Sequence, residues 1–225
     1  MPHKYDFLNR LLTLGMDQKW RKIATEICLS SKPKRVMDLC SGTGDLAIEL
    51  AKRASEDTQL VSADFCEPML ELARRKADKT GLGNKIIFQV ADAAELPFDD
   101  YYFDVIGIAF GFRNLTFKNP KTDLYLREIF RVIAPGGKLV IVETSQPRSY
   151  ILKRLTHLYL SSFAAPVGNA ISRQSGAYSY LAYSARNFYD PAQVCELLSK
   201  VGFDPIDFTL YWQGITAIHV AEVPS

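Results

Sequence analysis

Apolar residues follow two alternating periodicities along the chain, and this alternation predicts a repeating order of strand and helix. Apolar runs of strand length lie at 35–39, 59–64, 85–90, 103–110 and 138–142. Between them, apolar residues recur every three or four positions at 46–51, 69–77 and 124–132, as on one face of a helix. Strands that alternate with helices form right-handed crossovers, so the pattern predicts an α/β fold with a parallel sheet.

The two ends of the chain differ from this repeat. Residues 5–28 have helical spacing with a break at Gly15, which predicts two short helices that cover the start of the sheet. Asp190 and Gly202 are typical cap and stop residues for a helix between them. The alternating residues on both sides of Gln213-Gly214 predict a final antiparallel hairpin.

Residues 150–189 interrupt the strand–helix order and are rich in aromatic side chains. Five tyrosines follow Tyr150, namely Tyr159, Tyr178, Tyr180, Tyr183 and Tyr189. An aromatic insertion directly after a central strand is typical of a lid or a substrate wall. We therefore expect a single domain over 1–225, with a helical cover at 1–30 and a helical, aromatic lid at 150–189.

Residues 35–47 change from an apolar run to a glycine-rich turn and then to helical spacing. Gly42 and Gly44 lack a Cβ atom, so the backbone can approach a ligand closely, and the first N–H groups of the following helix point toward it. The turn is a candidate cofactor site. Taken alone, Gly42-x-Gly44-x-x-Ala47 also fits the fingerprint of a dinucleotide site.

Acidic residues around the turn distinguish between these cofactors. Asp38 lies at the strand end before the turn, and Asp45 lies at the start of the helix. Two carboxylates repel a diphosphate but suit a ligand with a cationic amine and a sulfonium, which favours S-adenosylmethionine. Asp64 ends the next strand, where an acid can bind the ribose hydroxyls of an adenosine cofactor.

Further polar residues follow the later strands. Asp92 comes after the third strand, and Arg113 and Asn114 come after the most apolar one. In an open α/β sheet the carboxyl ends of parallel strands meet at one edge, which is the binding crevice. Each aspartate alone could equally cap a helix or a turn. The acids and glycines together favour a cofactor site.

Composition and charge exclude several other classes of protein. The formal net charge of +2 gives no reason to expect a nucleic-acid-binding protein. The four cysteines show no C-x-x-C spacing and the three histidines are scattered, so we expect no metal site and reduced thiols in a cytoplasmic protein. Neither a leader nor an apolar run long enough to span a membrane is evident.

Three segments carry a resemblance to a known family. They are Tyr5-Asp6-Phe7-Leu8-Asn9 continuing to Trp20, Phe110-Gly111-Phe112-Arg113-Asn114, and Arg131-Val132-Ile133-Ala134-Pro135-Gly136-Gly137 continuing to Glu143-Thr144-Ser145. They resemble the class I S-adenosylmethionine-dependent methyltransferases, and within them the C-methyltransferases of menaquinone and ubiquinone synthesis. Two residues differ from the family: Asp17 stands where His is usual, and Ala134 where Lys is usual.

The resemblance implies a fold and a donor site. The fold is a Rossmann-like three-layer sandwich whose mostly parallel, seven-stranded sheet has a C-terminal antiparallel hairpin and a helical cap. By resemblance, Thr43 with the glycines holds the methionine part of S-adenosylmethionine and Asp64 its ribose. Asp92 with Ala93 holds the adenine, and Ala109 matches a position near the donor. The implied reaction is C-methylation of a demethylated prenylquinol, from demethylmenaquinol to menaquinol.

The acceptor side of the site is a hypothesis. Arg113 would stabilise the developing phenolate, directly or through water, because guanidinium is a permanent donor. Asn114 would orient it, and Tyr178 and Tyr180 would contact the quinol. The alternatives are that Arg113 only pairs with an acid in a loop and that the tyrosines only pack. His157 could act as a base, although its sequence context favours a structural helical position.

Other functions and partners stay open at this stage. The protein could methylate another small apolar acceptor at O or C, be a non-catalytic S-adenosylmethionine-binding module, or be a nicotinamide oxidoreductase, which Asp38 disfavours. Because prenylquinols have long apolar tails, residues 151–160 could dock at the inner face of a membrane, or could equally form a solvent-covered lid. The chain could act alone or as a homodimer.

Overall fold

Seven strands form one mixed sheet in the part of the chain that the computed structural model describes, which is residues 10, 13, 15–172 and 177–225. The strands are β1 (Arg35–Leu39), β2 (Gln59–Asp64), β3 (Ile86–Val90), β4 (Phe103–Ala109), β5 (Ile133–Thr144), β6 (Ile206–Tyr211) and β7 (Thr216–Glu222). Their order in the sheet is β3-β2-β1-β4-β5-β7-β6. The first five strands pair in parallel, and β7 pairs antiparallel with both β5 and β6. The predicted parallel sheet with a C-terminal hairpin is confirmed.

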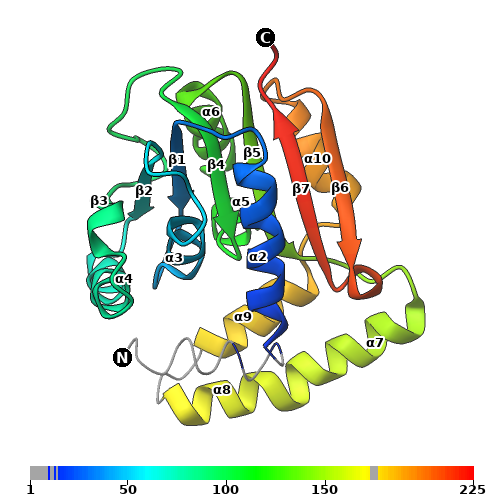
Figure 1. Ribbon diagram of the computed structural model, residues 1–225. Coiled ribbons are helices and arrows are strands. Elements are labelled where there is room, and N and C mark those ends of the chain that lie inside the picture. The colour runs from blue at the N-terminus through cyan, green and yellow to red at the C-terminus, as the bar shows by residue number, and fades with distance from the viewer. Residues whose placement is uncertain (1–9, 11–12, 14, 173–176) are drawn as a thin grey trace.

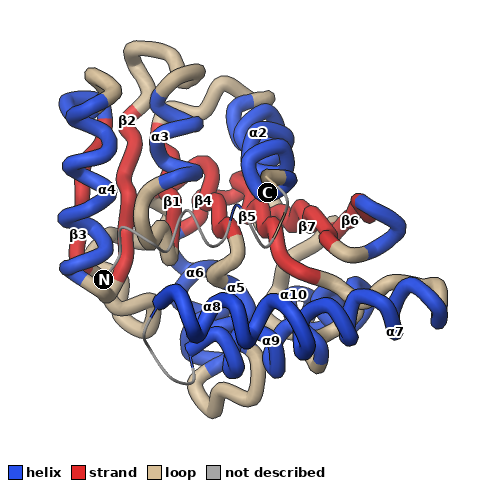
Figure 2. Tube along the Cα trace, turned by 90° about the horizontal axis from the view of Figure 1, so that it is seen from below, coloured by secondary structure: helices blue, strands red, loops and turns tan. Residues whose placement is uncertain are grey.

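Helices cover both faces of the sheet, as Figure 2 shows from below. One face carries α2 (Met16–Leu29), α3 (Asp45–Ala51) and α4 (Glu67–Lys79), and the other carries α5 (Phe112–Thr116), α6 (Thr122–Val132) and α10 (Pro191–Ser199). The two buried clusters follow this division, because successive strand side chains point to opposite faces. Val36 packs in the cluster with α2 and α3, whereas Met37 packs in the cluster with α6 and α10.

The remaining helices lie across the lower end of the sheet in Figure 1, beneath the arrowheads of β1 and β4. They are α7 (Tyr150–Tyr159), the π-helical turn η3 (Leu160–Ala164), α8 (Ala165–Ser172) and α9 (Ala177–Arg186). The described residues within 150–189 are thus mainly helical and lie at the edge where parallel strands end. None of the described helices has the length and apolar character needed to cross a membrane.

Two local features differ from the expectation or lie beyond it. The apolar run at 138–142 predicts a strand of about that length, but β5 already begins at Ile133 and continues to Thr144. Phe103 pairs with Ile133 and Val105 pairs with Lys138, so the residues between bulge out of the ladder while pairing continues. The first of the two helices expected at the N-terminus falls largely outside the described residues, whereas α2 accounts for the second.

Candidate active site

A cavity of about 1010 Å³ lies at the carboxyl ends of the central parallel strands. The loops after β1, β2, β3 and β4 and the end of β5 form one side, and residues of α2, α7 and α9 form the other. A crevice at this edge is expected where neighbouring crossovers leave the sheet on opposite faces. In the sheet order, β1 lies between β2 and β4, and the glycine turn follows β1.

The glycine turn is held close to α4. Gly42 and Gly44 both have positive φ, at 54° and 74°. A Cβ atom on Gly44 would lie 2.8 Å from the Cβ atom of Ala73, which is closer than side chains tolerate. Gly42 and Thr43 line the cavity, whereas Gly44 allows the turn to pack against α4 behind it. The two glycines therefore serve different purposes.

Asp38 lines the cavity and has one carboxylate oxygen without a hydrogen-bond partner. Its side chain is 1% exposed, and Oδ2 accepts a hydrogen bond of 2.8 Å from the backbone N–H of Ala47. The other oxygen, Oδ1, is buried and has no hydrogen-bond partner. Burial raises the pKa of Asp38 to about 8, because the charged form is poorly solvated. A cation in the cavity would remove this penalty, since buried carboxylates are stable when paired.

Asp45 differs from Asp38, although the sequence argument treated them alike. Lys76 Nζ lies 2.5 Å from Asp45 Oδ1, and Arg10 Nη2 lies 3.8 Å from the same oxygen. Positive charges, of which Arg21 and Lys76 are the main ones, outweigh its burial and lower its pKa. The charge of Asp45 is thus already compensated by side chains of the protein. The expectation that both acids bind a cationic ligand is therefore kept for Asp38 only.

Asp64 and Asp92 cap backbone turns and also line the cavity. Asp64 Oδ2 accepts from the backbone N–H of Gly42 at 2.8 Å, and Oδ1 accepts from that of Cys66 at 2.9 Å. Asp92 Oδ1 accepts from the N–H of Ala94 at 2.9 Å, and Ala93 lines the cavity beside it. Each carboxylate oxygen can accept a second hydrogen bond. The bonds to the backbone therefore fix the two carboxylates in place and leave them able to accept from a ligand.

Arg113 lies in α5 and is paired with a buried acid that sequence reasoning did not assign to the site. Its Nη1 donates to Glu143 Oε1 at 3.0 Å and to the hydroxyl of Thr144 at 2.7 Å, while its backbone N–H donates to Glu143 Oε2. Arg113 and Glu143 are 6% and 1% exposed. Among the described residues, neither Nε nor Nη2 of Arg113 has an acceptor, and Nε is buried. The arginine is therefore both paired and left with unused donors at the cavity.

The other predicted residues reach the cavity to different degrees. Ala109, Asn114 and Tyr180 all line it, and Tyr180 is 51% exposed. The backbone carbonyl of Asn114 accepts from Asn119, which ties the end of the short helix α5 to the following loop. Tyr178 belongs to α9, but its side chain lies outside the described residues. The roles of these residues stay predictions.

Residues from two further elements line the cavity without having been predicted as site residues. Asp17, Trp20 and Arg21 come from α2, and His157 comes from α7. Burial, with Arg186 and Lys153 nearby, lowers the pKa of His157, so its ring is neutral at pH 7. Glu143 could have been found from the sequence, because it ends a buried strand as Asp38 and Asp64 do. The contributions of α2 and α7 carry no comparable local signal.

Solved structures support the fold. A SAM dependent methyltransferase from Aquifex aeolicus superimposes with a TM-score of 0.61 at 18% identity, covering 88% of this chain and 89% of that one. An S-adenosyl-L-methionine-dependent methyltransferase described from Methanococcus maripaludis gives a TM-score of 0.65 at 19% identity, covering 100% and 92%. At these identities the likeness shows that the two proteins share the architecture of this chain.

Sequence comparisons identify the family. A demethylmenaquinone methyltransferase of Thermus thermophilus is 41% identical over 221 residues, covering 98% of this chain and 97% of the relative. The C-methyltransferase UbiE of ubiquinone/menaquinone biosynthesis from Shewanella baltica is 34% identical over 216 residues, covering 96% and 84%. The family model of the ubiE/COQ5 methyltransferases matches residues 1–222. The chain belongs to the ubiE/COQ5 methyltransferase family.

Proposed function

We propose that this methyltransferase uses S-adenosylmethionine to methylate a ring carbon of a demethylated prenylquinol, converting demethylmenaquinol to menaquinol. The names of the relatives support the acceptor. The observation that supports this donor is Asp38, which lines the cavity and has a buried Oδ1 without a hydrogen-bond partner. A cation stabilises the ionised form of Asp38, whereas a diphosphate beside it would oppose ionisation and leave the buried acid without a charge partner.

The residues present fit the donor. When bound, S-adenosylmethionine supplies an electrophilic methyl group on a sulfonium that is a good leaving group. Thr43 and the backbone of Gly42, which Gly44 holds in place against α4, would hold the methionine part beside Asp38. The Asp64 carboxylate would accept from the ribose hydroxyls, and Asp92 and Ala93 would border the adenine. Ala109, at the end of β4, would lie against the donor.

Arg113 would act on the acceptor. A quinol ring carbon becomes a good nucleophile when a ring hydroxyl loses its proton, so a phenolate oxygen must be stabilised. The unused N–H donors of Arg113 can supply this, directly or through water, while Glu143 and Thr144 fix the orientation of the guanidinium. Asn114 would orient the same oxygen. Because Arg113 is a permanent donor, it lowers the cost of the negative charge rather than removing the proton itself.

The wall formed by α7 and α9 suits an apolar ring and tail. Leu155, Tyr159 and Leu160 line the cavity from the α7 side, and Tyr180 and Leu181 line it from α9. Apolar walls exclude water from the reacting carbon and hold it in line with the methyl group, which is the main task in a transfer from a sulfonium. We therefore propose that residues 150–189 form the lid of a single domain spanning 1–225, in which residues 1–30 cover the sheet.

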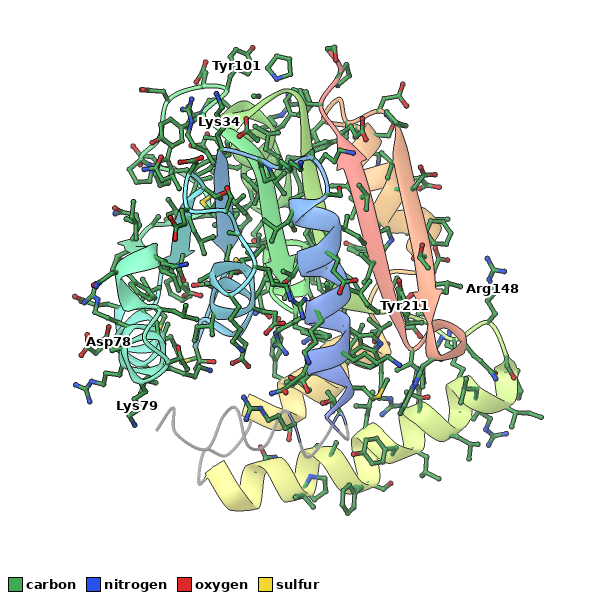
Figure 3. All side chains as sticks on the ribbon, in the orientation of Figure 1. Lys34, Asp78, Lys79, Tyr101, Arg148 and Tyr211 are labelled. Carbon is green, nitrogen blue, oxygen red and sulfur yellow. The ribbon has the colours of Figure 1, made fainter. Side chains whose placement is uncertain are left out.

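The outer face of α7 would contact a membrane surface. Ile151 and Leu158 lie two helical turns apart, do not line the cavity, and are 70% and 60% exposed. Arg154 lies among them, and Figure 3 shows Arg148 projecting away from the protein just before α7. Apolar side chains with basic neighbours fit the interface of an anionic bilayer, where a prenylquinol resides. A cytoplasmic enzyme could thus meet its acceptor at the inner face of the membrane.

Vesicle flotation tests this contact. The protein should float with vesicles that contain phosphatidylglycerol and much less with pure phosphatidylcholine. Ile151→Ser/Leu158→Ser should reduce flotation, whereas Leu124→Ser, an exposed leucine on α6, should not. If the α7 variant instead changes the sedimentation of the protein without lipid, the apolar face joins two copies in a homodimer. Flotation that is independent of α7 would contradict the membrane role.

The reaction itself is tested with reduced demethylmenaquinone and methyl-labelled S-adenosylmethionine. The product should carry the label on carbon and increase in mass by one methylene group. Phenolic acceptors should react much more slowly, and NADH should show no binding by calorimetry. Arg113→Lys should reduce kcat strongly while leaving donor affinity nearly unchanged. Labelled phenols without labelled quinol would indicate another acceptor, and donor binding without turnover would indicate a binding module.

A further inference from the structure

Arg21 occupies a fixed position on the cavity wall that the proposed reaction does not explain. Its Nη1 donates to Asp17 Oδ2 one helical turn earlier, with the two side chains 11% and 3% exposed. The hydroxyl of Thr13 donates to the other oxygen of Asp17 at 2.9 Å. The guanidinium carbon of Arg21 lies 5.0 Å from the centre of the Phe110 ring, which provides a cation–π contact. Asp17 and Phe110 thus fix the guanidinium group, and Thr13 in turn holds Asp17.

The charge of Arg21 acts on the glycine turn. It is the positive group that opposes the rise in the pKa of Asp38, and it is the first cation to lower the pKa of Asp45. Arg21, Asp38 and Asp45 all line the same cavity, so the guanidinium faces the space that the two acids face. The cavity wall therefore carries a guanidinium close to Asp38, whose Oδ1 has no partner.

The donors of Arg21 are not used up by Asp17. Among residues that the structure describes, the bond from Nη1 to Asp17 is the one hydrogen bond that Arg21 makes. Guanidinium has five N–H donors in a planar fork that matches a carboxylate. The N–H donors of buried or half-buried arginines usually have acceptors, so the remaining donors of Arg21 are available to water or a ligand.

We propose that Arg21 binds the carboxylate of the methyl donor's amino-acid group, while Asp38 binds its ammonium group. An α-amino acid carries its two charges on groups bonded to the same carbon, and the opposite charges of Arg21 and Asp38 match this zwitterion. Asp17 is then a positioning residue, because it holds Arg21 toward the cavity. The inference rests on the proposed S-adenosylmethionine site and adds a determinant that distinguishes the donor from adenosine compounds without the amino-acid group.

Two ligands separate the carboxylate from the rest of the donor. Decarboxylated S-adenosylmethionine keeps the sulfonium and the ammonium and lacks the carboxylate alone. Calorimetry without acceptor should show that wild type binds S-adenosylmethionine about 10- to 100-fold more tightly than the decarboxylated compound, the range for a charged hydrogen bond. Arg21→Met should abolish this preference, because only the first ligand loses a contact with its carboxylate, whereas any change in the pKa of Asp38 affects both ligands alike. Arg21→Lys should keep part of it.

Two controls address folding and position. Arg53→Met removes an arginine that pairs with Glu49 away from the cavity, and it should change neither affinity. Asp17→Asn should reduce the preference less than Arg21→Met, since the guanidinium is loosened rather than removed. If Arg21→Met does not fold, Arg21→Lys and the two ligands on wild type still decide the question.

The outcomes separate this inference from the proposed function. If wild type binds neither compound, the donor site itself is wrong. If wild type binds both equally, or if Arg21→Met keeps the full preference, the donor site stands and the role of Arg21 is wrong. An equal loss of affinity for both compounds in Arg21→Met would show that Arg21 shapes the cavity without contacting the carboxylate.

Discussion

The two halves of the cavity are built in different ways. The donor half comprises the ends of β1, β2 and β3 with the glycine turn, and the acceptor half comprises the ends of β4 and β5 with α5, α7 and α9. In the donor half, backbone N–H groups hold the acids: Ala47 holds Asp38, and Gly42 and Cys66 hold Asp64. In the acceptor half, backbone N–H groups also donate to Glu143, but the Arg113 guanidinium is held by the side chains of Glu143 and Thr144.

This difference has physical consequences. An acid held by backbone N–H groups keeps its place as long as the turn keeps its shape. A buried charge held by another side chain depends on that partner, because removal of either leaves an uncompensated charge. The acceptor half should therefore be the more sensitive to single substitutions, and the donor half the more sensitive to pH and backbone changes.

The largest effect is expected when the buried pair of the acceptor half is broken. Glu143→Gln leaves the Arg113 guanidinium without its counter-charge, which should reduce the free energy of unfolding by about 3–5 kcal/mol. Chemical denaturation measures this loss. Asp100→Asn is the matched control, because Asp100 pairs with Arg131 but is 61% exposed, so its removal should cost about 1 kcal/mol or less.

A double variant shows whether stability and chemistry separate. Arg113→Met/Glu143→Leu removes both charges and should recover most of the lost stability, since well-packed apolar pairs can replace buried ion pairs. Turnover should stay low, because no guanidinium remains for the phenolate. A loss below about 1 kcal/mol in Glu143→Gln would mean that water compensates Arg113 and that the acceptor half is not held as described.

The donor half should respond to pH through Asp38. In the free protein the pKa of Asp38 is about 8, and a cationic ligand favours the ionised form. Binding below pH 8 must therefore release the proton of Asp38, so donor affinity should rise about tenfold per pH unit up to pH 8 and then level off. Calorimetry in buffers of different ionisation enthalpy measures both the affinity and the released proton.

Asp38→Asn provides the comparison for this titration. The variant should bind the donor weakly, and its affinity should not show the rise of about tenfold per pH unit that the ionisation of Asp38 causes. Any titration of the ligand's own ammonium group is common to both proteins and cancels in the ratio. If the ratio of the wild-type affinity to the Asp38→Asn affinity does not change between pH 6 and 8, donor binding is not linked to the ionisation of Asp38.

The same difference explains what could be predicted from the sequence. The donor half lies within short segments, because a strand, a glycine turn and a strand-end acid are all local patterns, and backbone N–H groups are available at every turn. The prediction that Asp38, Gly42, Thr43, Asp64, Asp92 and Ala93 reach one cavity wall agrees with the geometry. Gly44 was predicted beside them, but the tight contact with Ala73 that explains it joins segments 29 residues apart.

The acceptor half could not be predicted in the same way. The partner of Arg113 lies 30 residues away, and no spacing rule joins a short helix after β4 to the end of β5. The contributions of α2 and α7 to the cavity depend on how whole helices lie against the sheet. Side-chain periodicity predicts that these helices have a buried face, but not which residues at their ends reach the cavity.

Backbone changes in the donor half should have an intermediate effect. Gly44→Ala and Gly81→Ala both place alanine at nearly the same positive φ, 74° and 73°, which costs about 1–2 kcal/mol in each. A Cβ at Gly81 meets nothing within 4 Å, whereas one at Gly44 meets Ala73. Gly44→Ala should therefore lose about 1–3 kcal/mol more stability and also weaken donor binding. If thermal unfolding shows equal losses of stability in Gly44→Ala and Gly81→Ala, α4 moves away from the added Cβ atom without cost.

The smallest expected effect concerns acceptor binding alone. Tyr180→Phe removes one hydroxyl from the cavity wall, and the loss of a single hydrogen bond to the quinol should raise the KM for the acceptor by about tenfold or less, with donor affinity unchanged. Tyr183→Phe is the matched control on the same helix, because the Tyr183 hydroxyl accepts from Lys118 at 2.8 Å rather than facing the cavity. Unchanged steady-state kinetics in both variants would assign Tyr180 to packing, and the acceptor half would then recognise the quinol ring through Arg113 and Asn114.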